Sequence, residues 1–269
     1  MLQEERRHRL LEFVRLRQFA VLPELVDQMG VSESTVRRDL DYLVELGSAR
    51  RTHGGVLYTG GLPRLPHFDG LTPTQWALKK AIARRATTLI EDNDAVLLDG
   101  GSTTYEVARL MVGRPLHVVT NSLPVANLFA SDKNSDLIFI GGNICPRTGV
   151  VRGPYADEML AKVRVRKTIL STAAVSDQGF YNNDLLLVET ERAMMRAASE
   201  VVVVVDSMKF GHQSLGHLCG LGDVDYVVVD DQIPDEWRNK IADAGVSLLV
   251  AEVSQSQAKA EATDDRSAD

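Results

Sequence analysis

Seven short runs of aliphatic residues between Ala95 and Ala251 restrict the fold of this chain more than any other feature. Each run is almost wholly apolar, and helical stretches separate several of them. Strands that are apolar on both faces must be buried on both faces, which is typical of a parallel sheet covered by helices. The runs are AVLLDG, LHVVT, DLIFIGG, KTILSTA, EVVVVVD, DYVVVD and VSLLVA, and helices are expected at about 76–91, 103–111, 123–130, 155–162, 188–199 and 234–244. The sequence therefore predicts a mostly parallel α/β domain over residues 76–253.

The first 58 residues have a helical pattern instead, with three amphipathic segments. A second helix is predicted between Pro23 and Gly30, because proline suits the first turn of a helix and glycine the position after its end. Ser32 stands at the N-cap of a third helix, which runs to Leu46 and is followed by two short extended pieces. This order predicts a winged helix-turn-helix domain over residues 1–58.

The third predicted helix begins with hydroxyl side chains and carries two arginines one turn later. Hydroxyl and guanidinium groups contact phosphates and base edges in DNA, and the hairpin adds further basic residues. The alternative is a solvated helix face, on which arginines pair with Glu33 or Asp41, followed by an ordinary exposed hairpin. The residues predicted to contact DNA are Ser32, Ser34, Thr35, Arg37, Arg38, Arg50, Arg51 and His53.

The net charge of -7 does not by itself suggest a DNA-binding protein. Acidic and basic residues cancel within residues 1–58, so any phosphate contact depends on the local arrangement of the arginines. The two cysteines, Cys145 and Cys219, are too few for a disulfide framework. No apolar run approaches the roughly 18 residues of a membrane helix, and the charged start argues against a secretory signal. These features favour a soluble protein of the cytoplasm.

Two segments have the pattern of neither domain. Residues 59–75 are rich in glycine and proline, which is typical of a linker. Residues 254–269 have almost no hydrophobic content and are expected to form a disordered tail. The predicted organisation is therefore a reader domain, a linker, an α/β domain and a tail.

Glycines and hydroxyls collect at the carboxyl ends of the predicted strands. The first strand runs through DGGSTT into a helix, so that glycines, hydroxyls and free helix N–H groups meet, as they do in phosphate sites. The pattern matches no nucleotide-binding motif. The competing interpretation is that these residues only form turns, cap helices or lie on the surface, with Asp99 orienting the glycine loop. The residues predicted to line a site for a small phosphorylated ligand are Asp99, Gly100, Gly101, Ser102, Thr103, Thr104, Thr120, Asn121, Ser122, Gly141, Gly142 and Lys209.

A metal site is not expected. His212, His217 and Cys219 lie close together in the sequence, but their spacing fits no zinc pattern. We expect a structural role for this segment, and neither a metal nor a cofactor is predicted.

The motifs VSESTVRRDLDYL, RRTHGG, DGGSTT, VVTNS, IGG and DSMKFG, in this order, resemble the DeoR family of bacterial transcriptional regulators. The resemblance covers nearly the whole chain apart from the tail. It implies a winged helix-turn-helix reader of double-stranded DNA, joined to a sensor domain with a fold like that of sugar-phosphate isomerases and CoA transferases, without catalysis. It also implies a phosphorylated sugar or related metabolite as effector, a repressor's role, and a homo-oligomer, either a dimer or a tetramer.

The sequence departs from the family pattern at one place. A Gly-Ala-Asp-Gly segment is common after the fourth core strand, whereas this chain has TAAV, with Ala174 at the place of the acid. An acid that could contact sugar hydroxyls, or transfer protons in the enzyme relatives, is therefore missing here. Glu189 matches a family glutamate and is the acidic residue predicted for the pocket.

Three functions remain open at this point. The first is a ligand-gated transcriptional regulator of a carbohydrate-metabolism operon. The second is a sugar-phosphate isomerase or deaminase with a helical extension, which the missing acid and the lack of a clear general base disfavour. The third is a regulator whose degenerate sensor serves only for oligomerisation, which only the altered TAAV segment supports.

Overall fold

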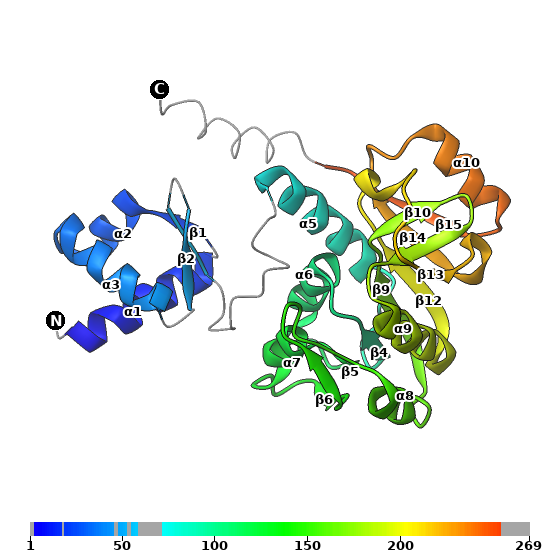
Figure 1. Cartoon of the computed structure of the whole chain (residues 1–269). Helices are drawn as coiled ribbons and strands as arrows, with labels where there is room; N and C mark the ends of the chain where they lie inside the picture. The colour runs from blue at the N-terminus through cyan, green and yellow to red at the C-terminus, as the bar shows by residue number, and fades with distance from the viewer. Residues whose placement is uncertain (1–2, 18, 46–47, 53–54, 59–71, 254–269) are drawn as a thin grey trace. The chain divides into compact units, whose positions relative to one another are not determined.

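The computed structural model describes residues 3–17, 19–45, 48–52, 55–58 and 72–253. The chain divides into two compact units, Met1–Leu65 and Pro66–Asp269 (Figure 1). Most of the predicted linker, the predicted disordered tail and His53 lie outside the described residues.

In its described residues, the N-terminal unit has three helices and a small antiparallel sheet in which the strand order is β1-β3-β2. Its elements are α1 (Gln3–Arg17), β1 (Phe19–Val21), α2 (Leu22–Met29), α3 (Glu33–Glu45), β2 (Ala49–Arg51) and β3 (Gly55–Tyr58). Gly30 ends α2 in the left-handed region, at a φ of 63°, and its N–H donates to the carbonyl of Val26. The predicted helix-turn-helix and wing are confirmed, whereas the three-residue strand β1 was not predicted.

Helices α1 and α3 are joined by a charged cluster and by a common apolar core. The carboxylate of Asp39, which is 1% exposed, accepts hydrogen bonds from Arg6 at 2.6 Å and Arg7 at 3.0 Å. Beneath it, Leu10 and Leu40 are buried in the same cluster of apolar side chains. These two arginines of α1 therefore have a structural role within the unit.

The C-terminal unit is built on a parallel sheet in the order β15-β14-β12-β9-β4-β5-β6. The strands are β4 (Ala95–Leu98), β5 (His117–Thr120), β6 (Asp136–Phe139), β9 (Val165–Ser171), β12 (Ala198–Val204), β14 (Tyr226–Asp230) and β15 (Ser247–Ala251). All seven predicted apolar runs are strands of this sheet, and the predicted fold class is confirmed.

Helices cover both faces of the sheet. Neighbouring residues of each strand point to opposite faces, so each face has its own apolar core. Leu98 packs in one core with residues of α5, α6 and α7, and Leu97 in another with residues of α8, α9 and α10. The helices are α5 (Pro73–Thr87), α6 (Ser102–Met111), α7 (Leu123–Phe129), α8 (Pro154–Leu160), α9 (Leu185–Ala197) and α10 (Asp235–Asp243). Helix α5 begins earlier than predicted because Thr72 and Gln75 form a capping box. No helix in the described residues is long and apolar enough to cross a membrane.

Several short strands lie outside the main sheet and were not predicted. The hairpin β7–β8 follows β6, and β10, β11 and β13 form a three-stranded antiparallel sheet. Their bounds are β7 (Asn143–Cys145), β8 (Val150–Arg152), β10 (Ala174–Ser176), β11 (Gly179–Asn182) and β13 (Gly216–Cys219), with 3-10 turns η1 (Ser207–Lys209) and η2 (Leu221–Asp223).

The strand order reverses between β4 and β9. From β4 the chain moves through β5 and β6 toward one edge, and from β9 through β12, β14 and β15 toward the other. In open parallel sheets, ligands bind outside the carboxyl ends of the strands at such a switch point. The fold therefore favours a site where β4 and β9 end.

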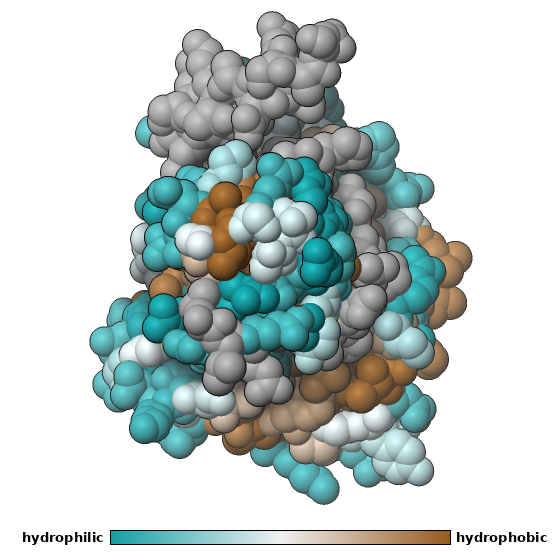
Figure 2. All heavy atoms as spheres, turned by 90° about the vertical axis from the view of Figure 1, so that its left-hand side faces the viewer, coloured by the Kyte–Doolittle hydropathy of each residue, from teal (hydrophilic) through white to brown (hydrophobic). Residues whose placement is uncertain are grey.

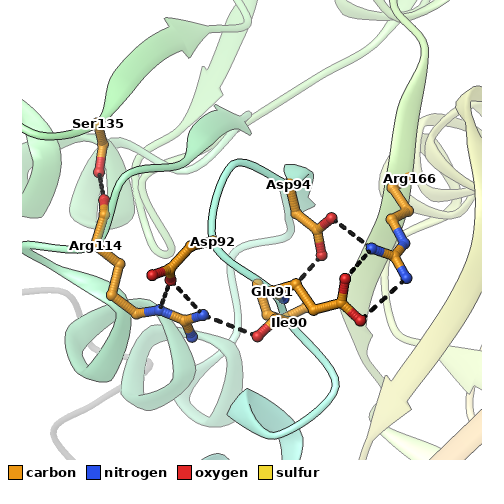
Figure 3. Close-up of polar contacts among 7 residues, drawn as sticks. All are labelled: Ile90, Glu91, Asp92, Asp94, Arg114, Ser135 and Arg166. Atoms are coloured by element: carbon orange, nitrogen blue, oxygen red, sulfur yellow. Dashed lines mark hydrogen bonds and ion pairs between the residues drawn. The ribbon is translucent and has the colours of Figure 1, made fainter.

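The amino ends of the strands are joined by ion pairs (Figure 3). Arg166 of β9 binds Glu91 and Asp94, both at 2.8 Å, in the loop between α5 and β4. Arg114, ahead of β5, binds Asp92 at 2.8 Å. These contacts attach the loop before β4 to the neighbouring strands.

Candidate nucleic-acid interface and anion site

The start of α3 presents a group of hydroxyls. The carbonyl of Ser32 accepts from the N–H of Thr35 at 2.9 Å and from the N–H of Val36 at 3.1 Å. The hydroxyl of Ser32 lies 3.0 Å from that of Ser34 and 2.9 Å from that of Thr35. Ser32 and Ser34 are exposed and Thr35 is half-buried. The structure therefore brings these three predicted residues together on the surface.

The two arginines of α3 differ in their surroundings. Arg37 forms the pair with Glu33 that the alternative interpretation expected, with Nη2 at 2.7 Å from Oε1. Both side chains are more than half exposed, and such a surface pair contributes only about 0.2–1 kcal/mol. Arg38 is exposed and has no ion pair within the described residues. Because the surface pair between Arg37 and Glu33 contributes little, a phosphate oxygen can replace the Glu33 carboxylate as the partner of Arg37.

The wing strand is attached to α3 through Arg51. Its guanidinium lies 2.8 Å from the carboxylate of Asp41 and donates to the carbonyl of Arg37 at 2.8 Å. Arg50, the preceding residue, is half-buried and also makes polar contacts. Figure 2 shows hydrophilic residues over much of the described surface on this side, with hydrophobic residues between them. Arg51 therefore connects the wing strand to α3 within the N-terminal unit.

The loop from β4 to α6 is shaped by close packing. A Cβ atom on Gly100 would lie 2.2 Å from Val150, and one on Gly101 would lie 1.9 Å from the hydroxyl of Ser171. Only glycine fits at either position, because the backbone of this loop packs closely against Val150 and Ser171. Gly101 is the N-cap of α6 and provides no side-chain cap.

The first turn of α6 has the features of an anion site. Ser102, Thr103 and Thr104 are all buried, and the hydroxyl of Thr104 has no hydrogen-bond partner in the described part of the chain. Helix N-termini bind anions through free N–H groups and the helix dipole. The arrangement suits a phosphate group.

A buried lysine that was not predicted lies beside this turn. Lys79 of α5 is 4% exposed, and its Nζ is 2.8 Å from the carboxylate of Asp206 and 3.4 Å from the hydroxyl of Thr103. Lys209, which was predicted, lies in η1, and its N–H donates to the carbonyl of Asp206. In the structure, the cationic side chain that contacts α6 is therefore that of Lys79.

The segment after β5 has mainly structural contacts. Thr120 donates to the carbonyl of Leu98 at 2.7 Å, and Ser122 caps α7 by accepting from Val125. The amide of Asn121 donates to Val151, but its Oδ1 is buried without a partner in the described residues. Among Thr120, Asn121 and Ser122, it is therefore Asn121 that has a buried side-chain oxygen free to accept a hydrogen bond within the described residues.

The two glycines after β6 shape the turn into β7. Gly141 is half-buried, and its N–H donates to the sulfur of Met159. Gly142 has a φ of 148°, and a Cβ on it would lie 2.9 Å from Val151. These contacts pack the turn against α8 and β8.

Four polar side chains meet where β4 and β9 end. Ser171 donates to Asp99 at 3.3 Å, and the amide of Asn182 donates to the two carboxylate oxygens of Glu191 at 2.6 Å and 2.8 Å. Burial raises the pKa of Asp99 to about 6, although hydrogen bonds from Gly100 and Ser171 oppose the shift. Burial, followed by the charge of Asp99, raises the pKa of Glu191.

The structure does not bring Glu189 into this group. Its side chain is 60% exposed and pairs with Arg192 at 2.7 Å, whereas Glu191 is fully buried. Ala174 is also buried, and its carbonyl accepts from the hydroxyl of Thr172 at 2.9 Å. The buried acid of this region is therefore Glu191, two residues after the predicted one.

The segment that contains His212, His217 and Cys219 has structural contacts. The Nε2 atom of His217 lies 2.9 Å from the carbonyl of Gln178, and its ring packs edge-on against Tyr181. Burial raises the pKa of the Cys219 thiol to about 12. The described residues contain no group of three or more histidine, cysteine, aspartate or glutamate side chains arranged to hold a metal.

Comparison with known proteins identifies both units. The DeoR C terminal sensor domain matches residues 74–231, and the DeoR-like helix-turn-helix domain matches residues 6–59. The HTH-type transcriptional regulator IolR of Bacillus subtilis is 31% identical over 86% of this chain and 92% of its own length. The Glycerol-3-phosphate regulon repressor of Escherichia coli is 29% identical over 92% of this chain and 99% of its own length. The solved ribose 5-phosphate isomerase A of Methanocaldococcus jannaschii is 16% identical, with a TM-score of 0.37 over 52% of this chain and 55% of that chain.

Proposed function

The chain belongs to the DeoR family of helix-turn-helix transcriptional regulators, and we propose that it represses a carbohydrate-metabolism operon under the control of a phosphorylated sugar or related metabolite. Membership implies a domain that binds DNA and a sensor that binds a small molecule, and the two relatives named above that are similar over most of their length, IolR and the Glycerol-3-phosphate regulon repressor, are transcriptional regulators. The proposal of repression is supported by the Glycerol-3-phosphate regulon repressor, which is similar over nearly its whole length.

The observation that carries the effector's class is the first turn of α6. It combines an uncapped helix N-terminus, the unpartnered hydroxyl of Thr104 and the ammonium group of Lys79 at the switch point of the sheet. A phosphate group could accept hydrogen bonds from all three, with Lys79 keeping its pair with Asp206. The proposed site is completed by the glycine loop, Asn121 and Lys209, and takes Glu191 in place of Glu189.

The proposed mechanism links the two units. The reader, residues 1–58, binds DNA through α3 and the wing, and the linker 59–75 joins it to the sensor, residues 76–253. Two readers held in a homo-oligomer in the cytoplasm contact two half-sites of a double-stranded operator, which increases affinity when their spacing fits. An effector that binds the DNA-incompetent state more tightly shifts the population and releases the operator.

Thermal unfolding of the full chain with inorganic phosphate and a panel of phosphorylated sugars tests the sensor. A ligand present at a hundred times its Kd stabilises the native state by about 2.7 kcal/mol, so a rise in Tm is expected for at least one compound. Thr104→Val should abolish that rise because it removes the unpartnered hydroxyl, and Thr88→Val, an exposed site on the same unit, should retain it. A complete absence of stabilisation would favour a degenerate sensor.

Binding to duplex DNA at several salt concentrations tests the reader. Arg37→Ala and Arg38→Ala should each weaken binding and reduce the salt slope by about one, because each loses one phosphate contact. Arg9→Ala is the matched control, since Arg9 pairs with Glu5 at the same spacing on α1 as Arg37 does with Glu33 on α3. Equal effects of the three substitutions would contradict the assignment of α3.

A further inference from the structure

Within the part of the chain that the structure describes, the buried acids at the end of β4 and in α9 have no positively charged partner. Asp99 is 2% exposed and Glu191 is fully buried. The groups that donate hydrogen bonds to them in the described residues are all neutral: the hydroxyl of Ser171, the amide of Asn182 and backbone N–H groups. Neither acid forms an ion pair within the described residues, and the Oδ1 atom of Asp99 has no hydrogen-bond partner there. Buried carboxylates are normally paired with cations, so this group is incomplete.

The electrostatic surroundings increase the shortage of positive charge. Glu191 experiences the negative charges of Asp99 and of Asp184, both of which raise its pKa. Two buried acids in such surroundings do not both ionise unless a cation joins them. An ammonium group would compensate for the charge, whereas a neutral hydroxyl would not.

The acids lie beside the proposed phosphate site. A Cβ atom on Gly101 would lie 1.9 Å from the Ser171 hydroxyl that binds Asp99, and 3.7 Å from the unpartnered hydroxyl of Thr104. The switch point therefore has an anion-binding end at α6 and an acidic end at Asp99 and Glu191. A ligand that spans both ends needs a phosphate group and a positive charge.

We propose that the effector is a phosphorylated metabolite that carries a protonated amine, and that Glu191 with Asp99 selects it by accepting hydrogen bonds from the ammonium group. This inference rests on the proposed function, because it names the chemical class of the effector at the same site. In this structure the amide of Asn182 donates to both carboxylate oxygens of Glu191. When the effector binds, its ammonium group replaces this amide as the donor. Glu191 is thus a specificity-determining residue.

Matched pairs of compounds test the proposal by titration calorimetry on the full chain. Glucosamine 6-phosphate and glucose 6-phosphate differ by one amine in place of a hydroxyl, and serinol phosphate and glycerol 3-phosphate form a shorter pair. A hydrogen bond to a charged group contributes about 1.5–3 kcal/mol, so the amine of a pair should bind about tenfold to a hundredfold more tightly. Inorganic phosphate measures the anion end alone.

Two substitutions on α9 assign the preference to a residue. Glu191→Gln should remove the preference for the amine and leave phosphate binding in place. Glu189→Gln, which changes an exposed carboxylate two residues away, should keep the preference. If Glu191→Gln fails to fold, Asp99→Asn is expected to reduce the same preference.

The outcomes separate this inference from the proposed function. Equal binding of amine and hydroxyl compounds, or a preference that persists in Glu191→Gln, would overturn the role of Glu191 while phosphate sensing stands. Failure of inorganic phosphate and of every phosphorylated compound to bind would overturn both.

Discussion

The amino ends and the carboxyl ends of the strands form two opposite sides of the parallel sheet, called here the amino edge and the carboxyl edge. The charged groups at these two edges have different partners. At the amino edge, arginines pair with carboxylates, as Arg166 does with Asp94 and Arg114 with Asp92 (Figure 3). At the carboxyl edge, several buried polar atoms have no hydrogen-bond partner in the described residues. They are Asp99 Oδ1, Thr104 Oγ1, Asn121 Oδ1 and Asp206 Oδ1.

Under the proposed function, this difference separates groups that stabilise the fold from groups that bind the effector. A buried polar atom without a partner costs about 1–3 kcal/mol relative to a satisfied one. Native proteins keep few such atoms, and four of the seven found in the described residues follow the carboxyl ends of strands, where ligands bind in open parallel sheets. The following substitutions test whether the two edges have these different roles.

The largest effect is expected where the carboxyl edge does contain an ion pair. Asp206→Ala would leave the ammonium group of Lys79, which is 5% exposed, buried without its partner. Breaking a buried pair from one side costs about 3–5 kcal/mol, so urea unfolding should show a loss of that size. The double substitution Lys79→Met with Asp206→Ala should recover much of it. A loss below about 1 kcal/mol for the single variant would show that solvent reaches the lysine.

A smaller effect of opposite sign is expected from Asp99→Asn. The pKa of this carboxyl is near its ordinary value of 3.8 in the unfolded chain and about 6 in the folded one. Between these values the folded state binds the additional proton, so the free energy of unfolding falls as the pH rises through this window. The full cost is about 3 kcal/mol above pH 6, and the variant should be more stable than the native chain by up to that amount at pH 7.5.

Urea unfolding at pH 4.5 and at pH 7.5 measures this effect. The native chain should lose stability between the two conditions, and Asp99→Asn should lose less. In the variant, the free energy of unfolding still falls with pH because of Glu191, whose pKa is raised in the same direction. Equal slopes in the two proteins would show that Asp99 is compensated by a group in its surroundings.

Much of the fold was predictable because its strands and helices are locally encoded. The seven apolar runs predicted the sheet, since burial on both faces leaves no other pattern. The short strands β7, β8, β10, β11 and β13 were missed, because three or four residues carry too little periodicity. The strand order was not predictable either, since the same runs are compatible with several orders of a parallel sheet.

For the candidate site, the sequence indicated the residues of the β4–α6 loop but not those that other strands and helices contribute. DGGSTT identified the start of α6 directly, whereas Ser171, Asn182 and Glu191 come together only through the strand order. Helical periodicity contained a signal that was not used. Glu191 lies three residues after the buried Val188, and Lys79 lies three before the buried Ile82, so both belong to the apolar faces of their helices. A charged residue on such a face indicates a buried partner or a site.

The smallest effect is expected at the amino edge. Arg166→Gln removes the pairs with Glu91 and Asp94, but Arg166 is 42% exposed, and solvent screens much of the loss. Because the contacts attach the loop before β4 to β9, the Tm should fall by a few degrees. Affinity for inorganic phosphate should not change, since the substitution lies at the opposite end of the strands. Weaker phosphate binding in Arg166→Gln would mean that the position of β4 depends on this ion pair, and that the two edges do not have separate roles.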